Sequence, residues 1–170
     1  RAVREAEVEA EEHFKTYVWY PQRAGRVDLV IERAQQHGVA SDLVIRQEIA
    51  ALISFQRTSE WTALRARAAR ALGRPPGPEG SLGKLAASQV ARMAHRVHTL
   101  ISGANGMLTT GDHPHDATIA EVLVSTPAQS IAGGTDEIQK SIIGEKILGL
   151  ARESDPSLEL PYREVARRSQ

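Results

Sequence analysis

Apolar residues recur every three to four positions along most of the chain, which is the spacing of an amphipathic α-helix. A first helical run covers residues 1–20, and Pro21 interrupts it because proline lacks the N–H that a continuing helix needs. The pattern resumes over residues 26–37, and Gly38 stands where a helix would end. The sequence therefore predicts one long helix with a distortion near residues 21–25, or two helices.

Two longer helical runs follow. Ser41 or Asp42 is a suitable N-cap for the first of them, which ends at the loop of residues 73–81. Prolines and glycines are too frequent in that loop for a helix to continue. Ser81 then caps the second run, which extends to the glycine-rich segment GANG at residues 103–106. Long helices joined by short connections predict a bundle.

The last part of the chain contains a short helical pattern near residues 117–124 and a final helix that begins at Thr135. Thr135 is a typical N-cap, and Asp136 and Glu137 place negative charge where the helix dipole favours it. Residues 151–170 are polar, and we expect a tail that runs over the surface or is mobile. With no alternating strand pattern, the sequence predicts an all-α fold, a four-helix bundle of long helices.

Composition narrows the class of protein. Hydrophobic residues make up 41% and charged residues 25% of the 170 residues, and the formal net charge is zero, which argues against a nucleic-acid or membrane surface. The absence of cysteine excludes disulfides, thiolate metal sites and a cysteine nucleophile. No apolar run reaches the roughly 18 residues that span a bilayer. We expect a cytoplasmic protein, and because the chain begins at Arg1 within a charged run, a piece of a longer one.

Histidine and tryptophan side chains offer candidate sites that have simpler explanations. The motif HPHD at residues 113–116 contains metal-ligand types, but a proline separates its histidines, and a solvated loop is favoured. His95 and His98 share one helix face without further ligands nearby, which favours a packed interface. Trp19 and Trp61 are interpreted as core or interface residues.

The segment Gly133-Gly134-Thr135 precedes the last helix. Such a helix start leaves backbone N–H groups free at the positive end of the dipole, where an anionic or polar ligand group can bind. No phosphate-binding GxxxxGK[ST] or GxGxxG motif is present. From these residues alone, an ordinary helix cap remains the simpler interpretation.

The stretch IAGGTDEIQKSIIGEKILGL at residues 131–150 resembles the C-terminal signature of the acyl-CoA dehydrogenase family, in which G-T-x-E-I-Q leads into a helix. Upstream, RQEIAAL resembles the second long helix of that family, PEGSLGKLAASQ its loop and third helix, and SGANGML its glycine-rich turn. The resemblance implies a C-terminal α-helical bundle domain over residues 1–150 and a polar tail over 151–170. The family's N-terminal helical and middle β domains are absent from this chain.

This resemblance implies a bacterial FAD-dependent enzyme of fatty acid metabolism. In the family, a carboxylate removes the α-proton of an acyl-CoA thioester while a hydride passes from the β-carbon to FAD, which yields a 2-enoyl-CoA. An electron-transfer flavoprotein-like acceptor then reoxidises the flavin. The C-terminal domain forms dimer and tetramer contacts with a neighbouring subunit, in a homo- or hetero-oligomer, and reaches that subunit's FAD.

The resemblance also implies which residues contact FAD. Thr135 and Glu137 resemble the pair near its adenosine part, and Gly134 allows close approach. The glycine-rich turn, which would pass the pyrophosphate of the partner subunit's FAD, consists of Gly103, Ala104 and Gly106. Arg33 resembles the arginine that binds FAD phosphate across the dimer, although the following glycine stands one residue further along than in the family. Gln47 resembles the glutamine on the next helix, after a longer connection, whereas an apolar leucine, Leu100, replaces another expected glutamine.

No catalytic residue is assigned. Many members place the catalytic glutamate where this chain has Gly133, which cannot abstract a proton. A subgroup similar to isovaleryl- and long-chain-acyl-CoA dehydrogenases keeps glycine there and takes the glutamate from the first helix, just before an arginine, which would place it ahead of Arg1. Five glutamates of the first run are interpreted as a solvated face, because buried carboxylates so close would repel: Glu5, Glu7, Glu9, Glu11 and Glu12. The alternatives are a non-catalytic assembly subunit that completes a partner's FAD site, or an oxidase or flavin monooxygenase of related fold.

Overall fold

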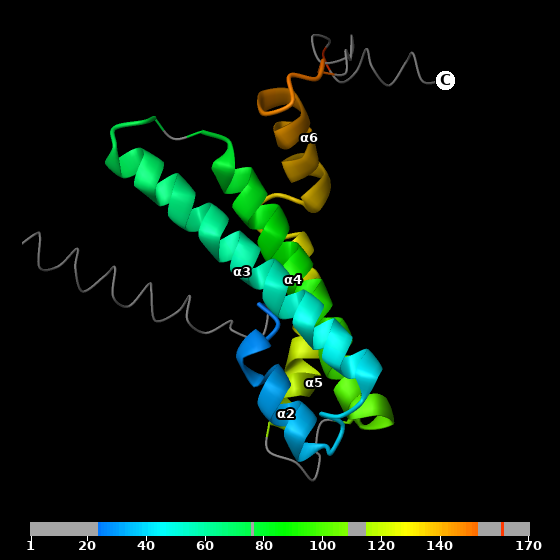
Figure 1. Ribbon diagram of the computed structural model, residues 1–170. Helices are drawn as coiled ribbons and strands as arrows, with labels where there is room; N and C mark the ends of the chain where they lie inside the picture. The colour runs from blue at the N-terminus through cyan, green and yellow to red at the C-terminus, as the bar shows by residue number, and fades with distance from the viewer. Residues whose placement is uncertain (1–23, 76, 109–114, 153–160, 162–170) are drawn as a thin grey trace, which may run out of the picture.

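The computed structural model describes residues 24–75, 77–108 and 115–152, together with residue 161. Within these ranges every regular element is helical and no strand occurs, which confirms the predicted all-α fold (Figure 1). The helix expected over residues 1–20, with Trp19, and nearly all of the expected tail lie outside the described residues. Among the helices that are described, none is long and apolar enough to cross a bilayer.

The described elements follow the predicted order, with η marking a 3-10 helix. They are η1 (Val27–Leu29), α2 (Val30–Gln36), α3 (Leu43–Ala71), α4 (Glu79–Ser102), η2 (Gly103–Met107), α5 (Asp116–Ser125), η3 (Thr126–Ser130) and α6 (Asp136–Lys146). The prediction that Ser81 caps this helix is wrong: the N-cap is Pro78, three residues earlier, and Glu79 lies in the first turn. The sequence pattern thus locates every long helix of the described chain.

Side-chain caps fix the starts of α3 and α6. Asp42 accepts hydrogen bonds from the backbone nitrogens of Val44, at 2.8 Å, and Ile45, at 3.0 Å. Thr135 accepts one from the backbone nitrogen of Ile138, at 3.3 Å. Each cap satisfies N–H groups that have no partner inside the helix, which explains why the sequence marks these two boundaries clearly.

Helix α4 is the centre of the described fold. It packs side by side with α3, to which the loop after α3 connects it, and it also contacts α2, α5 and α6 (Figure 1). The main core lies where α2, α3 and α4 meet, and consists of Val30, Ala34, Ile45, Leu52, Val90, Ala94, Val97 and Ile101. A smaller cluster joins η1 to α5 through Leu29, Ile119 and Val122.

Gly25 is the point of closest approach between the segment before η1 and α4. Its φ of +90° lies in the left-handed region, and a Cβ atom there would lie 2.6 Å from the Cβ of Ala94. Only glycine adopts this positive φ easily and also fits this close to Ala94 without displacing α4. This contact places the carbonyl groups of Gly25 and Arg26 against α4, where His98 reaches them.

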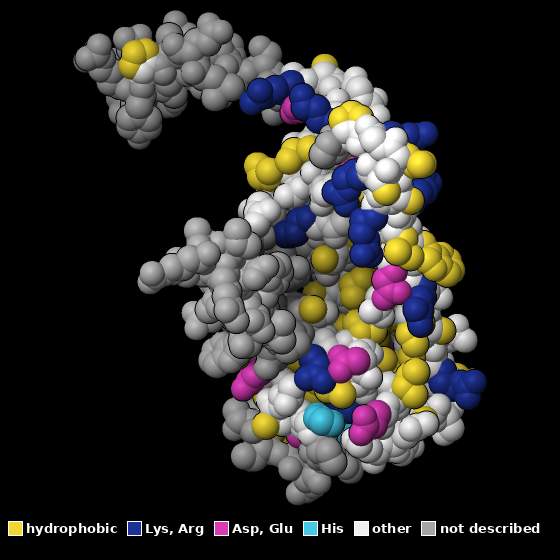
Figure 2. Space-filling view, turned by 90° about the vertical axis from the view of Figure 1, so that its left-hand side faces the viewer, with side chains coloured by type: hydrophobic (Ala, Val, Ile, Leu, Met, Phe, Trp, Pro, Cys, Tyr) yellow, Lys and Arg dark blue, Asp and Glu magenta, His cyan; other side chains and the backbone are white. Residues whose placement is uncertain are grey.

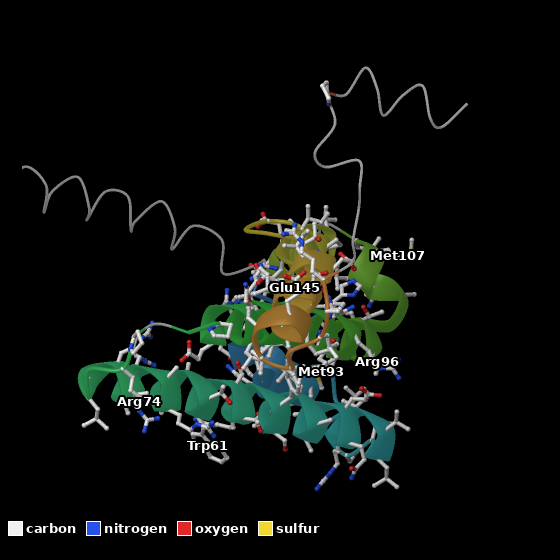
Figure 3. All side chains as sticks on the ribbon, turned by 90° about the horizontal axis from the view of Figure 1, so that it is seen from above. Trp61, Arg74, Met93, Arg96, Met107 and Glu145 are labelled. Carbon is white, nitrogen blue, oxygen red and sulfur yellow. The ribbon has the colours of Figure 1, made fainter. Side chains whose placement is uncertain are left out.

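The C-terminal half of α3 is exposed, which narrows the expectation that Trp61 is a core or interface residue. Trp61 is 65% exposed and Leu64 54% exposed, so Trp61 is not a core residue within the described structure, and its place in an interface stays a prediction. Trp61 projects from the side of α3 that faces away from α4 (Figure 3). Figure 2 shows hydrophobic side chains interspersed with Lys and Arg on the face of the molecule that it presents. Helical spacing predicted the stripe correctly, but among the described elements α3 packs mainly against α4, with a smaller contact to α2.

Candidate functional site

The turn before α6 is built from two left-handed glycines followed by the Thr135 cap. Gly133 has a φ of +69° and Gly134 a φ of +92°. The Gln139 amide folds back over the turn, with its Nε2 atom 3.3 Å from the carbonyl oxygen of Gly133, to which it donates. A Cβ atom on Gly134 would lie 2.7 Å from that same Nε2 atom. Glycine is therefore favoured at position 134 chiefly by its left-handed conformation, and a Cβ atom there would also displace the Gln139 amide.

The residues that follow this turn differ in exposure. Thr135 is half-buried because its hydroxyl caps the helix, whereas Glu137 is exposed in the first turn of α6. Asp136, between them, is buried and points toward α4. An approaching group would therefore meet the backbone of the turn and the Glu137 carboxylate, but not Asp136.

A polar stripe on α4 holds the turn in place. It consists of Lys84, Ser88 and Arg92, which are spaced four residues apart and so share one helix face. Lys84 Nζ donates to the carbonyl oxygen of Gln129 at 2.6 Å and to Ser88 Oγ at 3.0 Å, and Ser88 Oγ also donates to that carbonyl, at 3.0 Å. Arg92 Nη1 donates to Ser130 Oγ at 2.7 Å. We name Lys84, Ser88, Arg92 and Asp136 the anchor cluster.

Asp136 is the acidic member of the anchor cluster. It forms ion pairs with Arg92 and with Lys84, whose Nζ atom lies 3.7 Å from Asp136 Oδ1. Burial alone would raise the pKa of this carboxyl, but hydrogen bonds, foremost that from Arg92, and the charges of Arg92 and Lys84 hold the pKa below its ordinary value. Asp136 is therefore ionised at neutral pH and links α6 to α4.

Arg33 lies in a second polar cluster, at the other end of α4. Its guanidinium is fully buried, and Nη2 donates to Ser102 Oγ at 2.8 Å and to Asp116 Oδ1 at 3.0 Å. His37 Nε2 lies 3.2 Å from the same Nη2 atom, and His98 Nδ1 lies 3.1 Å from Nη1. The guanidinium thus joins α2 to α4 and α5, and faces no solvent in this structure.

The hydrogen bonds of His98 define its tautomer. Its Nε2 atom lies 3.0 Å from the carbonyl oxygen of Gly25 and 3.2 Å from that of Arg26, so Nε2 must carry the proton and donate. Nδ1 is then the acceptor for Arg33. Burial, and secondarily the positive charge of Arg33, lowers the pKa of His98 to about 4, so the ring is neutral at physiological pH.

Asp116 corrects the interpretation of the motif HPHD as a solvated loop. Its side chain is only 10% exposed and pairs with Arg33, because α5 begins at this residue and packs beside α2. Its neighbour His115 is exposed, and the first two residues of the motif lie outside the described residues. Within the described ranges, no group of three or more histidine, aspartate and glutamate residues could hold a metal ion. The sequence had no local signal for this long-range pairing.

The predicted glycine-rich turn directly follows the Arg33 cluster. Gly103 ends α4 with a φ of +54°, and both Gly103 and Ala104 are exposed. Gly106 is half-buried, and a Cβ atom there would lie 3.2 Å from that of Ser102. Since Ser102 accepts from Arg33, the arginine lies behind this turn rather than on its surface. Gln47 is exposed on the first half of α3.

The structure separates the predicted flavin contacts into two groups. The α6 start meets α4 at Arg92, through Asp136, whereas the glycine-rich turn follows Ser102, roughly 15 Å further along the helix at 1.5 Å per residue. The α6 start fits a flavin contact, since Gly133 and Glu137 are exposed. Arg33 does not fit a phosphate contact in this arrangement, because Asp116 and His98 already bind its buried guanidinium.

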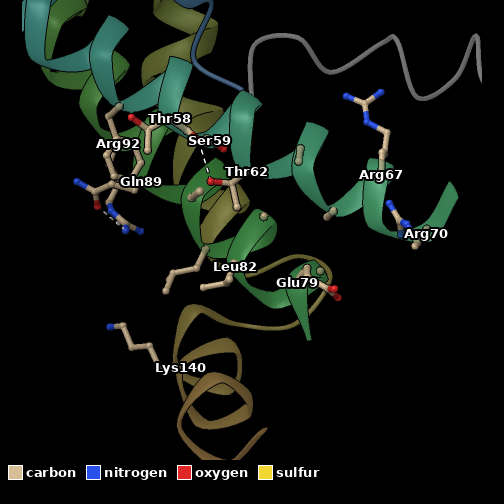
Figure 4. Close-up of a pocket in the computed structure, with 17 residues that line it drawn as sticks. Thr58, Ser59, Thr62, Arg67, Arg70, Glu79, Leu82, Gln89, Arg92 and Lys140 are labelled. Carbon is tan, nitrogen blue, oxygen red and sulfur yellow. Dashed lines mark hydrogen bonds between the residues drawn. The ribbon is translucent and has the colours of Figure 1, made fainter. Parts of the chain in front are cut away.

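A groove of about 800 Å³ between α3, α4 and α6 was not predicted. Its walls are largely small or apolar residues, including Phe55 and Leu82, and Arg67, Arg70 and Lys140 stand around it (Figure 4). The sequence pattern at the arginine-rich end of α3 predicts an ordinary solvated face. Only the packing of α3 against α4 shows that this end of α3 borders a groove.

Comparison with known proteins agrees with the signature at the α6 start. The family model "Acyl-CoA dehydrogenase, C-terminal domain" matches residues 24–148. Acyl-CoA dehydrogenase IpdE1 of Mycobacterium tuberculosis is 31% identical over 131 residues, which cover 74% of this chain and 31% of that protein. The helical domain is thus of acyl-CoA dehydrogenase type. The chain belongs to the acyl-CoA dehydrogenase family and carries its C-terminal domain.

A solved structure agrees with the fold. A chain of the ChsE4–ChsE5 complex of Mycobacterium tuberculosis superposes with a TM-score of 0.63 at 20% sequence identity, over 78% of this chain and 36% of that one. At this identity the likeness concerns the fold alone. The chain spans about a third of the length of both relatives.

Proposed function

We propose that this chain is part of an FAD-dependent acyl-CoA dehydrogenase that converts an acyl-CoA thioester to a 2-enoyl-CoA. In this proposal, the helical domain contributes FAD contacts and an interface to a neighbouring subunit. The observation that supports it most is the α6 start. Gly133 and Gly134 form a turn without side chains, Thr135 caps the helix and Glu137 is exposed. This arrangement occurs in a chain that belongs to a family of flavoenzymes.

The residues at the α6 start have distinct roles in this proposal. Gly134 has no side chain, so a polar group of the cofactor can approach its backbone from the side that Gln139 does not cover. Glu137 accepts hydrogen bonds from hydroxyl groups, and Thr135 keeps the first turn of α6 in register. Bound FAD supplies the hydride acceptor of the reaction. The base lies on none of these residues.

The second proposed group of contacts serves the FAD of a neighbouring subunit. Gly103, Ala104 and Gly106 lie at the C-terminal end of α4, and their exposed or half-buried positions leave room for a cofactor group to approach the backbone. Arg33 supports this turn from behind through Ser102. Direct contact between Arg33 and a phosphate requires that Asp116 release one guanidinium nitrogen. Gln47, exposed on α3, remains a proposed contact with the same cofactor.

Product analysis in the intact protein tests this function. The protein, purified with any subunit that accompanies it, is incubated with acyl-CoA thioesters and an artificial electron acceptor. Formation of 2-enoyl-CoA with reduction of the acceptor supports the proposal. Hydrogen peroxide formation in air, without need for the acceptor, would instead indicate an acyl-CoA oxidase. An electron-transfer flavoprotein replaces the artificial acceptor in a second assay of the proposed cytoplasmic electron partner.

A non-catalytic assembly subunit is the second candidate. Gly133 favours it, because this position has no side chain where many relatives carry the base. The fold relative is a complex of two named proteins, ChsE4 and ChsE5, which makes a hetero-oligomer worth testing here. Native mass spectrometry and flavin content per chain distinguish the two: an assembly subunit co-purifies with a different chain and adds no activity of its own.

A further inference from the structure

Lys84 is a partly buried cation with an unusual set of partners. Its side chain is 17% exposed, although lysine is among the residues least often buried. Two donated hydrogen bonds go to the Gln129 carbonyl oxygen and Ser88 Oγ, and the Asp136 carboxylate lies 3.7 Å away. Two of the three ammonium donors are therefore hydrogen-bonded, and the carboxylate adds an ion pair without a hydrogen bond. Partial burial of this charge is tolerated because two acceptors and an opposite charge lie next to it.

The partners of Lys84 lie at both ends of the turn that precedes α6. Gln129 belongs to η3, before the turn, and Asp136 is the first residue of α6. The middle of the turn lies against the same side chain, because a Cβ atom on Gly133 would be 3.9 Å from Lys84 Cε. One lysine on α4 therefore hydrogen-bonds to the residue before this segment and pairs with the residue after it, and its Cε atom lies beside Gly133.

The turn at Gly133 and Gly134 needs contacts of this kind to hold its conformation. Gly133 and Gly134 both lie in the left-handed region, and adjacent glycines have little conformational preference of their own. Their conformation must be imposed by contacts outside the turn. Gln139 supplies one such contact from α6, through its bond to the Gly133 carbonyl. Lys84 supplies the contact from α4, and unlike Arg92, whose side chain is 43% exposed, it is largely shielded from competing water.

We propose that Lys84 is a positioning residue that fixes the conformation of residues 130–135 and thereby the backbone of Gly134 and Thr135. Its relevance to the cofactor rests on the proposed function. Its action on the turn does not, because the hydrogen bond to Gln129 and the ion pair with Asp136 are present without any ligand.

The test compares Lys84→Met with Lys84→Arg in the full chain, with Lys140→Met as the matched control. Lys140 is an exposed lysine on α6. Amide hydrogen exchange is measured by mass spectrometry over residues 129–139 and over the α4 core, residues 90–101. We expect Lys84→Met to speed exchange over residues 129–139 by about tenfold while exchange in the α4 core is unchanged. In this variant, local opening of the turn does not have to break the hydrogen bonds and the ion pair of Lys84. Lys84→Arg restores slow exchange, and Lys140→Met leaves it unaltered.

Several results would overturn the proposal. Unchanged exchange over residues 129–139 in Lys84→Met would do so, as would equal acceleration across the α4 core, which indicates a general loss of stability. If Lys84→Met does not fold, Lys84→Gln, which keeps an N–H donor without the charge, must still show faster exchange confined to the turn. A titration of FAD fluorescence separates the two proposals: localised exchange with unchanged FAD affinity supports the positioning role and contradicts the proposed flavin contact.

Discussion

Arg33 and Asp116 form a buried ion pair that joins α2 to the first residue of α5, with Arg33 Nη2 3.0 Å from Asp116 Oδ1. The pair lies directly behind the glycine-rich turn, because Arg33 also binds Ser102. It therefore stabilises the fold at the place where the family resemblance predicts a phosphate contact.

Loss of the Asp116 carboxylate should lower the free energy of unfolding. Asp116→Ala leaves the fully buried Arg33 without its counter-charge, and breaking one partner of such a pair typically costs about 3 to 5 kcal/mol. The free energy of unfolding, measured with urea, checks this. Asp28→Ala is the control: Asp28 pairs with Arg26 but is 62% exposed, and such surface pairs contribute about 0 to 1 kcal/mol. Equal losses in the two variants would contradict the buried role of Asp116.

We expect the free energy of unfolding to fall in mild acid because of His98. Its pKa is lowered from 6.5 to about 4 in the native state, so between these values the unfolded chain binds more protons. The stability that the neutral His98 ring contributes is complete above pH 6.5 and is lost as the pH falls toward 4. Between pH 7 and pH 4.5, the wild type should lose about 2 to 3 kcal/mol more than His98→Gln, which cannot titrate. Parallel losses in the two proteins would show that His98 is not the group responsible.

Two glycines should respond to alanine in opposite directions. Gly134→Ala should destabilise by about 1 to 3 kcal/mol, because φ is +92° and the new Cβ would lie 2.7 Å from Gln139 Nε2. Gly83→Ala should stabilise by up to about 1 kcal/mol, since this position lies within α4 and a Cβ atom would meet nothing within 4 Å. Thermal unfolding of both variants is the measurement. A neutral Gly134→Ala would contradict the described turn.

Glu137→Ala should weaken FAD retention without affecting folding. The side chain is exposed, so its removal costs little stability, whereas loss of a hydrogen bond to the cofactor should raise the dissociation constant of FAD about tenfold. The pH dependence of proton abstraction should not change, since Glu137 is not the base. Glu60→Ala, at an exposed position on α3, is the control. Unchanged FAD affinity in Glu137→Ala would remove this residue from the proposed site.

Local sequence signals predicted the helices and their caps well. Asp42 and Thr135 mark helix starts because each capping bond joins residues two or three positions apart, and such chemistry is visible in sequence. Contacts between distant segments were not predictable in this way. Asp116 pairs with a residue 83 positions away, so its motif indicated only a loop. Lys84 similarly reaches Gln129, 45 positions along the chain.

Exposure was harder to predict than helicity. Trp61 follows helical spacing, but whether an apolar stripe is buried depends on what packs against it. The family signature was the most informative sequence feature at the candidate site, because Gly134 and Thr135 meet local backbone requirements that a few residue types satisfy. The anchor cluster behind them became visible only when α4 and α6 were placed together.

Anaerobic flavin spectroscopy of the intact protein, purified with its neighbouring subunit, is the most direct measurement of the proposed function. The protein should carry FAD, and its visible absorption band should bleach when an acyl-CoA substrate is added. In Gly134→Ala, FAD should be retained more weakly than in the wild type. A protein that binds no flavin under any condition, alone or with its partner subunit, would contradict the proposal.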